Sequence, residues 1–221
     1  MNSPTFLYLV QTPGKIPEIY DYLKSKKIVL LSFKENTEET DIFFPGSTWT
    51  TGRNKLREHV ISKNMVFDYY IFLDDDVQFE EMSQEEGFNK FEEMVNIYKP
   101  EICVPKLQLF YDNLFDNNIN STVTTIFYDA IYSCFSHKML LNNIIFPYDD
   151  TFDKNSWWIS QYILFMLCSL LNIDILLFRN INISNTQHNE YPRSMEKSNE
   201  AQEHVFKKLS DLNIQFDKKW Y

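Results

Sequence analysis

The sequence predicts an α/β fold in which helices flank both faces of a central, mostly parallel β-sheet. In the first half, short apolar runs alternate with stretches whose apolar residues recur at helical spacing. Consecutive parallel strands need a crossover, and an intervening helix supplies it, so this alternation favours a parallel sheet covered on both sides. The 221 residues contain neither an internal repeat nor a dividing linker. We therefore expect one domain spanning residues 1–221.

Four strands are expected in the first half, each a continuous apolar run, at residues 5–10, 28–33, 69–73 and 102–105. Helical spacing predicts helices over residues 16–26 and 52–64 and a third helix after Ser83. Ser83 and Glu86 form a capping-box pattern at the start of that third helix. These elements make up a first half of about residues 1–106.

The second half, about residues 107–221, has a different character. An Asn/Asp-rich loop is expected at 111–121, followed by strands at 123–127 and 131–135 that join near Asp129 as a smaller β element. A buried helix at 157–171, a strand at 173–178, a polar loop through Arg193 and an amphipathic helix at 200–212 complete the chain.

The charge balance limits the partners. The formal net charge is −10, with no block of Lys and Arg, so the phosphate backbone of a nucleic acid would be repelled. Hydrophobic residues make up 44% of the chain, which is a globular composition. An acidic protein that binds an anionic ligand needs local Arg or Lys side chains or a bound cation.

The cysteines and apolar runs predict the cellular compartment of the protein. Cys103, Cys134 and Cys168 lie far apart in apolar segments, as expected of buried free thiols in a reducing compartment. The longest apolar run, 157–171, falls short of the roughly 20 residues that cross a bilayer. No signal-peptide pattern is visible at the N-terminus. We expect a cytoplasmic protein without a membrane span.

Three consecutive carboxylates carry the strongest chemical signal. Asp74, Asp75 and Asp76 directly follow the apolar run 69–73, and open α/β sheets bind ligands at the carboxyl ends of their strands. Side chains alternate along an extended chain, so Asp74 and Asp76 are expected to point to the same side. Two carboxylates suit a hard divalent cation, Mg²⁺ or Mn²⁺, which can then hold a diphosphate.

Other proteins use the same carboxylate pattern. Phosphatases of the haloacid dehalogenase type place it after their first strand, whereas here it follows the third strand. A Walker B strand also ends in acids, but no GxxxxGK[ST] motif occurs in this sequence. A nucleotidyltransferase would carry a Gly-rich, basic loop after its first strand, and residues 11–15 match that loop poorly.

A second signal lies at residues 46–54. Thr50 or Thr51 is expected to cap a helix whose first turn carries Gly52, Arg53 and Asn54. The N–H groups at a helix N-terminus attract anions, glycine permits close backbone approach, and arginine adds a fork of donors. This segment is therefore a candidate phosphate-binding site.

Together these segments resemble the GT-A glycosyltransferases. In that Rossmann-like fold a helix before the metal-binding strand contributes to the nucleotide-sugar site, and the strand then ends in Asp-x-Asp. Residues 51–54 and 73–76 match this arrangement in order and spacing. The resemblance implies a donor half at about 1–106, an acceptor half at about 107–221, and donor contacts from Gly52, Arg53, Asn54, Asp74 and Asp75.

The same resemblance implies ligand-binding roles for further residues. Many GT-A enzymes supply a late histidine to the metal or diphosphate, which here implies His188 beside Asp74 and Asp76, with Arg193 as a phosphate contact. Gln11 and Thr12 end the first strand, where these enzymes hold the nucleobase.

The acceptor side is implied in the same way. Inverting enzymes place a general base before an acceptor-side helix, which implies Asp153 or Asp150. Of the adjacent Trp157 and Trp158, one is expected in the core and the other as a wall for a sugar ring. Asp129 could accept hydrogen bonds from sugar hydroxyls.

The sequence thus predicts a metal-dependent glycosyltransferase. It would move a sugar from a nucleotide-sugar donor, with a UDP-sugar favoured, to a glycan or other hydroxyl acceptor, using Mn²⁺ or Mg²⁺. The alternatives are a nucleotidyltransferase or phosphatase that uses the same carboxylates, and a non-catalytic binding module.

Overall fold

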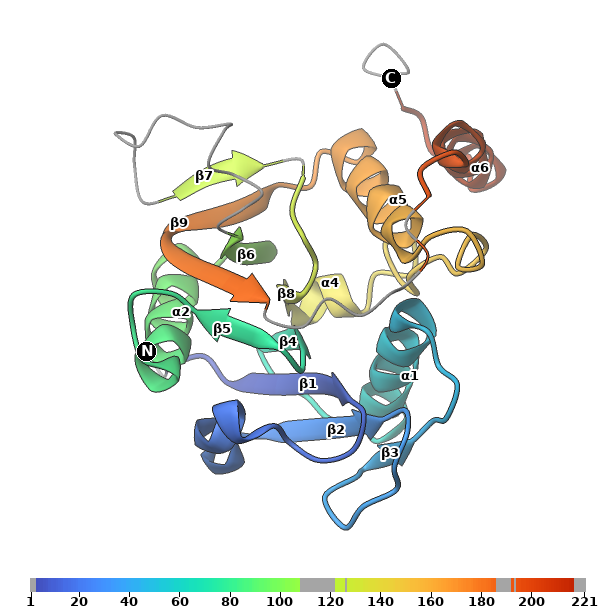
Figure 1. The fold of residues 1–221 in the computed structure, drawn as a ribbon. Helices are drawn as coiled ribbons and strands as arrows, with labels where there is room; N and C mark the ends of the chain where they lie inside the picture. Colours follow the sequence, from blue (N-terminus) through green and yellow to red (C-terminus); the bar gives the residue numbers. More distant parts are fainter. Residues whose placement is uncertain (1–2, 108–121, 126, 186–191, 193, 217–221) are drawn as a thin grey trace.

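The computed structural model describes residues 3–107, 122–125, 127–185, 192 and 194–216. Nine strands of this part of the chain form one sheet (Figure 1). In chain order they are β1 (Phe6–Thr12), β2 (Ile28–Ser32), β3 (Ile42–Phe43), β4 (Tyr69–Asp74), β5 (Val77–Phe79), β6 (Ile102–Leu107), β7 (Thr122–Thr125), β8 (Tyr132–Ser136) and β9 (Ile175–Asn185).

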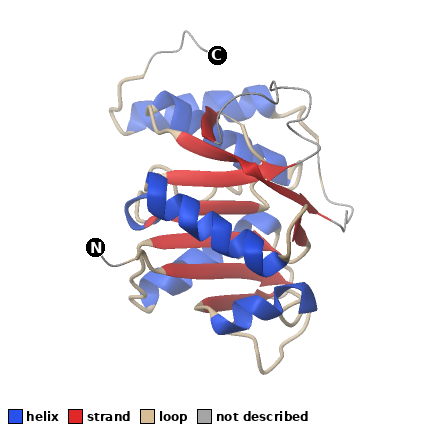
Figure 2. Cartoon of the chain, turned by 90° about the vertical axis from the view of Figure 1, so that its left-hand side faces the viewer, coloured by secondary structure: helices blue, strands red, loops and turns tan. Residues whose placement is uncertain are grey.

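Helices cover both faces of this sheet (Figure 2). They are the 3₁₀ helix η1 (Glu18–Ser25) and the α-helices α1 (Trp49–Ser62), α2 (Gln84–Tyr98), α4 (His137–Leu140), α5 (Trp157–Leu170) and α6 (Ser198–Asp211). In Figure 1, α1 and α5 lie on one side of the sheet, and α2 lies on the other. None of the helices within the described ranges is long and apolar enough to cross a membrane.

The strand order is β3-β2-β1-β4-β8-β6-β9-β5, with β7 also paired to β9. The first-half strands β2, β1 and β4 are parallel neighbours, as predicted. The second half differs, because β8 runs antiparallel between β4 and β6 and because β5 and β7 run antiparallel to β9. The predicted α/β fold with a helix-flanked central sheet is confirmed.

The strands on either side of Asp129 pair with different neighbours. β7 pairs with β9, and β8 lies between β4 and β6, so the described strands of the second half extend the one sheet. Four of the five residues of β8 are buried. A strand that is buried to this extent must pair its backbone on both edges, and the position between β4 and β6 provides both partners.

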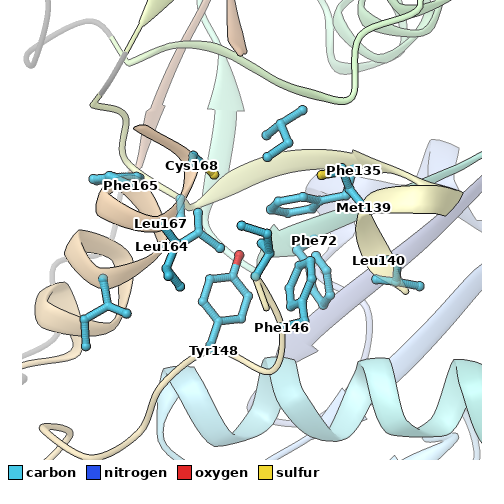
Figure 3. Close-up of a cluster of buried hydrophobic side chains, with 14 of the residues drawn as sticks. Phe72, Phe135, Met139, Leu140, Phe146, Tyr148, Leu164, Phe165, Leu167 and Cys168 are labelled. Carbon is cyan, nitrogen blue, oxygen red and sulfur yellow. The ribbon is translucent and has the colours of Figure 1, made fainter. Parts of the chain in front are cut away.

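Side-chain alternation along β1 divides the core between the two faces. Leu7 and Leu9 pack with the α1 and α5 cluster, whereas Tyr8 and Val10 pack with the η1 and α2 cluster. Figure 3 shows the first of these clusters, in which Phe135 contacts Phe72 and Phe146 edge to face, with ring centroids 5.8 and 4.9 Å apart.

Helix α1 begins three residues before the predicted start at Gly52. Its N-cap is Thr48, whose hydroxyl accepts a hydrogen bond from the Thr51 amide at 3.1 Å, while the Thr51 hydroxyl accepts one from the Thr48 amide at 2.8 Å. This reciprocal capping box fixes the helix start at Trp49. Thr51 is therefore the partner of the cap and lies inside the first turn.

Candidate functional site

The carboxyl ends of β1, β2 and β4 meet at one edge of the sheet, where the structure has a cavity of about 370 Å³. Both halves of the chain line it. The first half contributes Gln11, Phe33, Lys34, Ser47, Trp49, Asp74, Asp75 and Asp76, and the second half contributes Asp129, Ile131, Trp157, Trp158, Gln161 and Asn185. The predicted carboxylate run thus lies in a cavity formed by the two halves together.

Asp74 faces helix α1. Tyr70 and Phe72 of β4 belong to the core cluster on the α1 side, so the alternation of the strand directs Asp74 to that side as well. Its Oδ1 accepts hydrogen bonds from Arg53 Nη2 at 2.5 Å and from the Trp49 indole at 3.1 Å. The carboxylate of Asp74 therefore already has a cationic partner within the protein.

Arg53 is placed differently from the prediction. The residue is 1% exposed, and its guanidinium lies 4.3 Å from the centroid of the Trp49 ring and 5.4 Å from that of Phe72. Besides its bond to Asp74, its Nε and Nη1 have no hydrogen-bond partner among the described residues. A guanidinium enclosed in this way positions Asp74, and its burial argues against the predicted contact with donor phosphate.

Asp75 and Asp76 form the turn between β4 and β5. Strand β4 ends at Asp74, so the alternation that was expected to align Asp76 with Asp74 stops before Asp76. Burial and the charge of Asp76 raise the pKa of Asp75 to about 6, while Lys34 acts to lower it. Burial likewise raises the pKa of Asp74, to about 7, despite the Arg53 charge. Burial and the neighbouring carboxylates thus disfavour the charged forms of Asp74 and Asp75, and a bound cation would favour them.

This donor set fits a divalent cation that a ligand helps to bind. In the part of the chain that the structure describes, no three His, Cys, Asp or Glu side chains are grouped to hold a metal ion by themselves. Mg²⁺ and similar hard cations commonly take one or two carboxylates and complete their shell with water and substrate phosphates. Asp76 and Asp75 could supply such carboxylates. His188, the predicted third ligand, lies outside the described residues.

Gly52 and Asn54 shape the site through internal contacts. The Asn54 side chain exchanges two hydrogen bonds with the backbone of Tyr148, at 2.8 and 2.7 Å, so it joins α1 to the second half. Gly52 faces Gln11, whose Nε2 donates to the carbonyl of Thr48 at 3.1 Å. Neither Gly52 nor Asn54 lines the cavity, so the predicted donor contacts of these two residues stay predictions.

Replacing Gly52 with alanine is expected to destabilise the fold, although alanine is the better helix former by about 1 kcal/mol. An added Cβ would lie 2.4 Å from Gln11 Nε2, so the buried Gln11 would have to move. We expect a net loss of about 1–3 kcal/mol in the free energy of unfolding, measured by urea denaturation. A substitution of the exposed Glu58 on the same helix by alanine is the control. Equal or greater stability of Gly52→Ala would contradict the close contact with Gln11.

The two residues at the end of β1 have different surroundings. Gln11 lines the cavity, and its Oε1 is buried without a hydrogen-bond partner among the described residues. Thr12 is 1% exposed, and its hydroxyl donates to the Lys15 carbonyl at 3.0 Å. Only Gln11 of this pair is thus in a position to contact a ligand in the cavity.

The predicted general bases do not line the cavity. The carboxylate of Asp153 accepts hydrogen bonds from the hydroxyls of Thr48 and, at 2.6 Å, Thr50, so it fastens the first turn of α1 to the segment before α5. Asp150 is exposed to solvent. Among the described lining residues of the second half, the acidic one is Asp129.

The two tryptophans differ in their burial. Trp157 packs against the core cluster, and Trp158 is 36% exposed, while both line the cavity. Arg193, the predicted phosphate contact, lies outside the described residues.

Several cavity residues were not predicted, among them Lys34, Gln161 and Asn185. Lys34 carries the only positive charge among the described lining residues. It follows β2, whose carboxyl end lies beside those of β1 and β4, so its position in the sequence was a usable signal. Gln161 and Asn185 had no such signal, because only the packing of the second half brings them to this edge.

Comparisons with known proteins give a match at the level of structure. No protein-family model matches this sequence, and no curated protein matches it. The solved structure of residues 1–349 of TarS from S. aureus is similar with a TM-score of 0.53 and 13% identity, over 97% of this chain and 67% of that chain.

Two further structures show the same likeness. GalNAc-T7, solved with UDP, GalNAc and Mn²⁺, matches with a TM-score of 0.56 and 10% identity over 97% of this chain and 55% of its own. A glycosyltransferase involved in glycosylation of the major capsid of PBCV-1 matches with a TM-score of 0.50 and 11% identity, over 92% of this chain and 100% of that one. At these identities the likeness shows the fold. The predicted GT-A fold is confirmed.

Proposed function

We propose that this protein is a metal-dependent glycosyltransferase that moves a sugar from a nucleoside-diphosphate donor, with UDP favoured, to a hydroxyl group of a glycan. The observation that carries the proposal is the cavity at the end of β4, where Asp74, Asp75 and Asp76 meet Lys34 and residues of the second half. The similarity to GalNAc-T7, which was solved with UDP, GalNAc and Mn²⁺, supports the choice of donor and cation.

Each side of the cavity would bind one part of the donor. Asp76, with Asp75 beside it, would hold a Mn²⁺ or Mg²⁺ ion, which supplies charge stabilisation for the diphosphate. Lys34 would contact a phosphate oxygen, in the role predicted for Arg53. Gln11, which lines the cavity, would contact the nucleobase through its side-chain amide. His188 stays a predicted third ligand, and Arg193 stays a predicted phosphate contact.

In the reaction, the acceptor oxygen bonds to the anomeric carbon, and the bond from that carbon to the diphosphate oxygen breaks. The nucleoside diphosphate leaves with the electron pair, and the hydroxyl proton passes to a base. Asp129 is the second-half carboxylate in the cavity, so it is better placed to bind that hydroxyl than Asp153 or Asp150. Trp157 and Trp158 would border the transferred sugar.

The proposal predicts that UDP stabilises the protein only in the presence of Mn²⁺ or Mg²⁺. A ligand at 100 times its Kd adds about 2.7 kcal/mol, and a chain of this size gains about 2–4 °C in Tm per kcal/mol. Thermal unfolding with UDP, UDP-sugars and AMP, each with and without Mn²⁺, measures this effect. A shift with UDP and Mn²⁺ of about 5 °C or more is expected, and a smaller one with AMP.

Hydrolysis separates the alternatives. A glycosyltransferase should slowly cleave a UDP-sugar to UDP and free sugar, whereas a phosphatase would prefer p-nitrophenyl phosphate, and a nucleotidyltransferase would release pyrophosphate from a nucleoside triphosphate. A non-catalytic binding module would cleave none of them. Faster cleavage of p-nitrophenyl phosphate than of every UDP-sugar tested would overturn the proposal.

A further inference from the structure

A second, smaller cavity lies beside the first. Its volume is about 110 Å³, and it shares Asp129, Trp158 and Gln161 with the larger cavity. The rest of its lining is aromatic or apolar and includes Phe127, Tyr162 and Met195. We refer to this second cavity as the aromatic subsite.

One face of helix α5 forms a wall of the aromatic subsite. Trp158, Gln161, Tyr162 and Phe165 follow the spacing i, i+3, i+4, i+7, which places them along a single stripe of the helix. Gln161 lies within this stripe at the border with the larger cavity. Its Oε1 accepts the Ala130 amide at 3.2 Å, which fixes the orientation of the side-chain amide and leaves Nε2 as a donor.

Residues 127–129, between β7 and β8, also line the aromatic subsite. The Thr125 hydroxyl bonds to both the amide and the carbonyl of Phe127, at 3.2 and 2.6 Å, which fixes the backbone at this point. Tyr128 is buried against Phe165, with ring centroids 4.7 Å apart. The flanking Phe127 and Asp129 line the subsite, so this segment brings an aromatic ring and a carboxylate to it.

Three partly exposed apolar side chains gather at the subsite. Phe127 is 46% exposed, Trp158 36% and Met195 40%, and all three line this one cavity. Exposed apolar side chains that gather at one place, rimmed by polar groups, mark binding sites more often than scattered ones do. The polar groups here are Asp129 and Gln161, at the border with the proposed donor cavity.

We infer that the aromatic subsite binds a pyranose ring of an uncharged glycan acceptor, next to the point of transfer. The inference rests on the proposed function and names the acceptor class for it. The face of an aromatic ring is electronegative and attracts the positively polarised C–H groups of a pyranose, whose hydroxyls then point sideways to Asp129 and Gln161. A volume of about 110 Å³ is well below the roughly 300 Å³ of pockets for larger ligands, so the subsite has room for no more than one ring.

The charge of the subsite lining disfavours binding of a phosphorylated acceptor. The described lining of the aromatic subsite contains the carboxylate of Asp129 and neither Arg nor Lys. A phosphate-bearing sugar or lipid would meet like charge there, without a cationic partner. The chain as a whole carries a net charge of −10, which adds to this repulsion.

The test is binding of small probes by saturation-transfer NMR. The neutral probes are the methyl glycosides of glucose, galactose and N-acetylglucosamine, and the charged probes are glucose 6-phosphate and octyl phosphate. We expect at least one neutral glycoside to bind through its ring C–H protons, and to bind more tightly than either phosphate. Phe127→Ala and Trp158→Ala are each expected to weaken that binding about 5–10-fold. Phe43→Ala, which removes a similarly exposed ring (43%) on β3, should not weaken it.

The outcomes separate this inference from the proposed function. If UDP and Mn²⁺ still stabilise the protein but no neutral glycoside binds, or if Phe127→Ala and Trp158→Ala both bind as the wild type does, the acceptor assignment is overturned and the donor site stands. Tighter binding of glucose 6-phosphate or octyl phosphate would also overturn it. Absence of the UDP effect would instead defeat the proposed function. Circular dichroism of both variants checks that they fold.

Discussion

Replacing Asp76 with asparagine is expected to lower cleavage of UDP-sugars about 100-fold or more and to abolish the stabilisation by UDP and Mn²⁺. The substitution keeps the size of the side chain and removes the negative charge that would hold the cation. A bound cation contributes several kcal/mol to the stabilisation of a leaving diphosphate, and about 2.7 kcal/mol corresponds to 100-fold in rate. Steady-state hydrolysis at saturating Mn²⁺, with UDP detected as product, measures the effect.

Two further variants test whether the effect is specific to the cation ligand Asp76. Asp211→Asn makes the same charge change at an exposed position near the end of α6 and should behave as the wild type. Asp74→Asn alters the residue that Arg53 already pairs, so it should reduce stability as well as activity. Wild-type Mn²⁺ dependence in Asp76→Asn would exclude Asp76 as the cation ligand.

Replacing Arg53 with methionine is expected to have the largest effect on stability, a loss of about 3–5 kcal/mol in the free energy of unfolding. The substitution leaves Asp74, whose side chain is 19% exposed, without its cationic partner. Methionine fills much of the space between Trp49 and Phe72, so the loss reports on the charge pair more than on packing. Urea denaturation at pH 7.5 measures it.

The double variant distinguishes the coupling energy of the Arg53–Asp74 pair from the contacts that each residue makes with its other neighbours. Adding Asp74→Asn to Arg53→Met removes the unpaired charge, so part of the stability should return, and the double-mutant cycle gives the coupling energy. Arg53→Lys should not restore full stability, because an ammonium lacks the planar fork that lies between the two rings. If Arg53→Met loses less than about 1 kcal/mol, Arg53 does not hold Asp74 in the way described here.

The elements that the sequence predicted best were those with strong local patterns. β1, β2, β4 and β6 are continuous apolar runs, and α2 has its capping box at Ser83, so each lies within a few residues of its expected place. β3, β5 and α4 contain two, three and four residues, which is too short for a periodic pattern.

The arrangement of the second half could not be read from local patterns. The sequence around β8 predicts a strand, but it gives no sign that the strand lies between β4 and β6, whose residues are distant in the chain. The same limit applies to the site. The run of three aspartates was visible, whereas the burial of Arg53 against Asp74 depends on how α1 packs on β4. Asp153 was predicted as a general base because it precedes the helix at 157–171. In the structure its carboxylate accepts hydrogen bonds from Thr48 and Thr50 at the start of α1.

The central claim is that a divalent cation at the end of β4 carries the diphosphate of a nucleotide donor. Crystals grown with UDP and Mn²⁺, with data collected at the manganese absorption edge, test this claim most directly. We predict an anomalous peak between the Asp76 carboxylate and the diphosphate of UDP, in the cavity that Lys34 and Gln11 also line. UDP bound in that cavity without a manganese peak beside Asp76, or manganese bound only elsewhere, would contradict it.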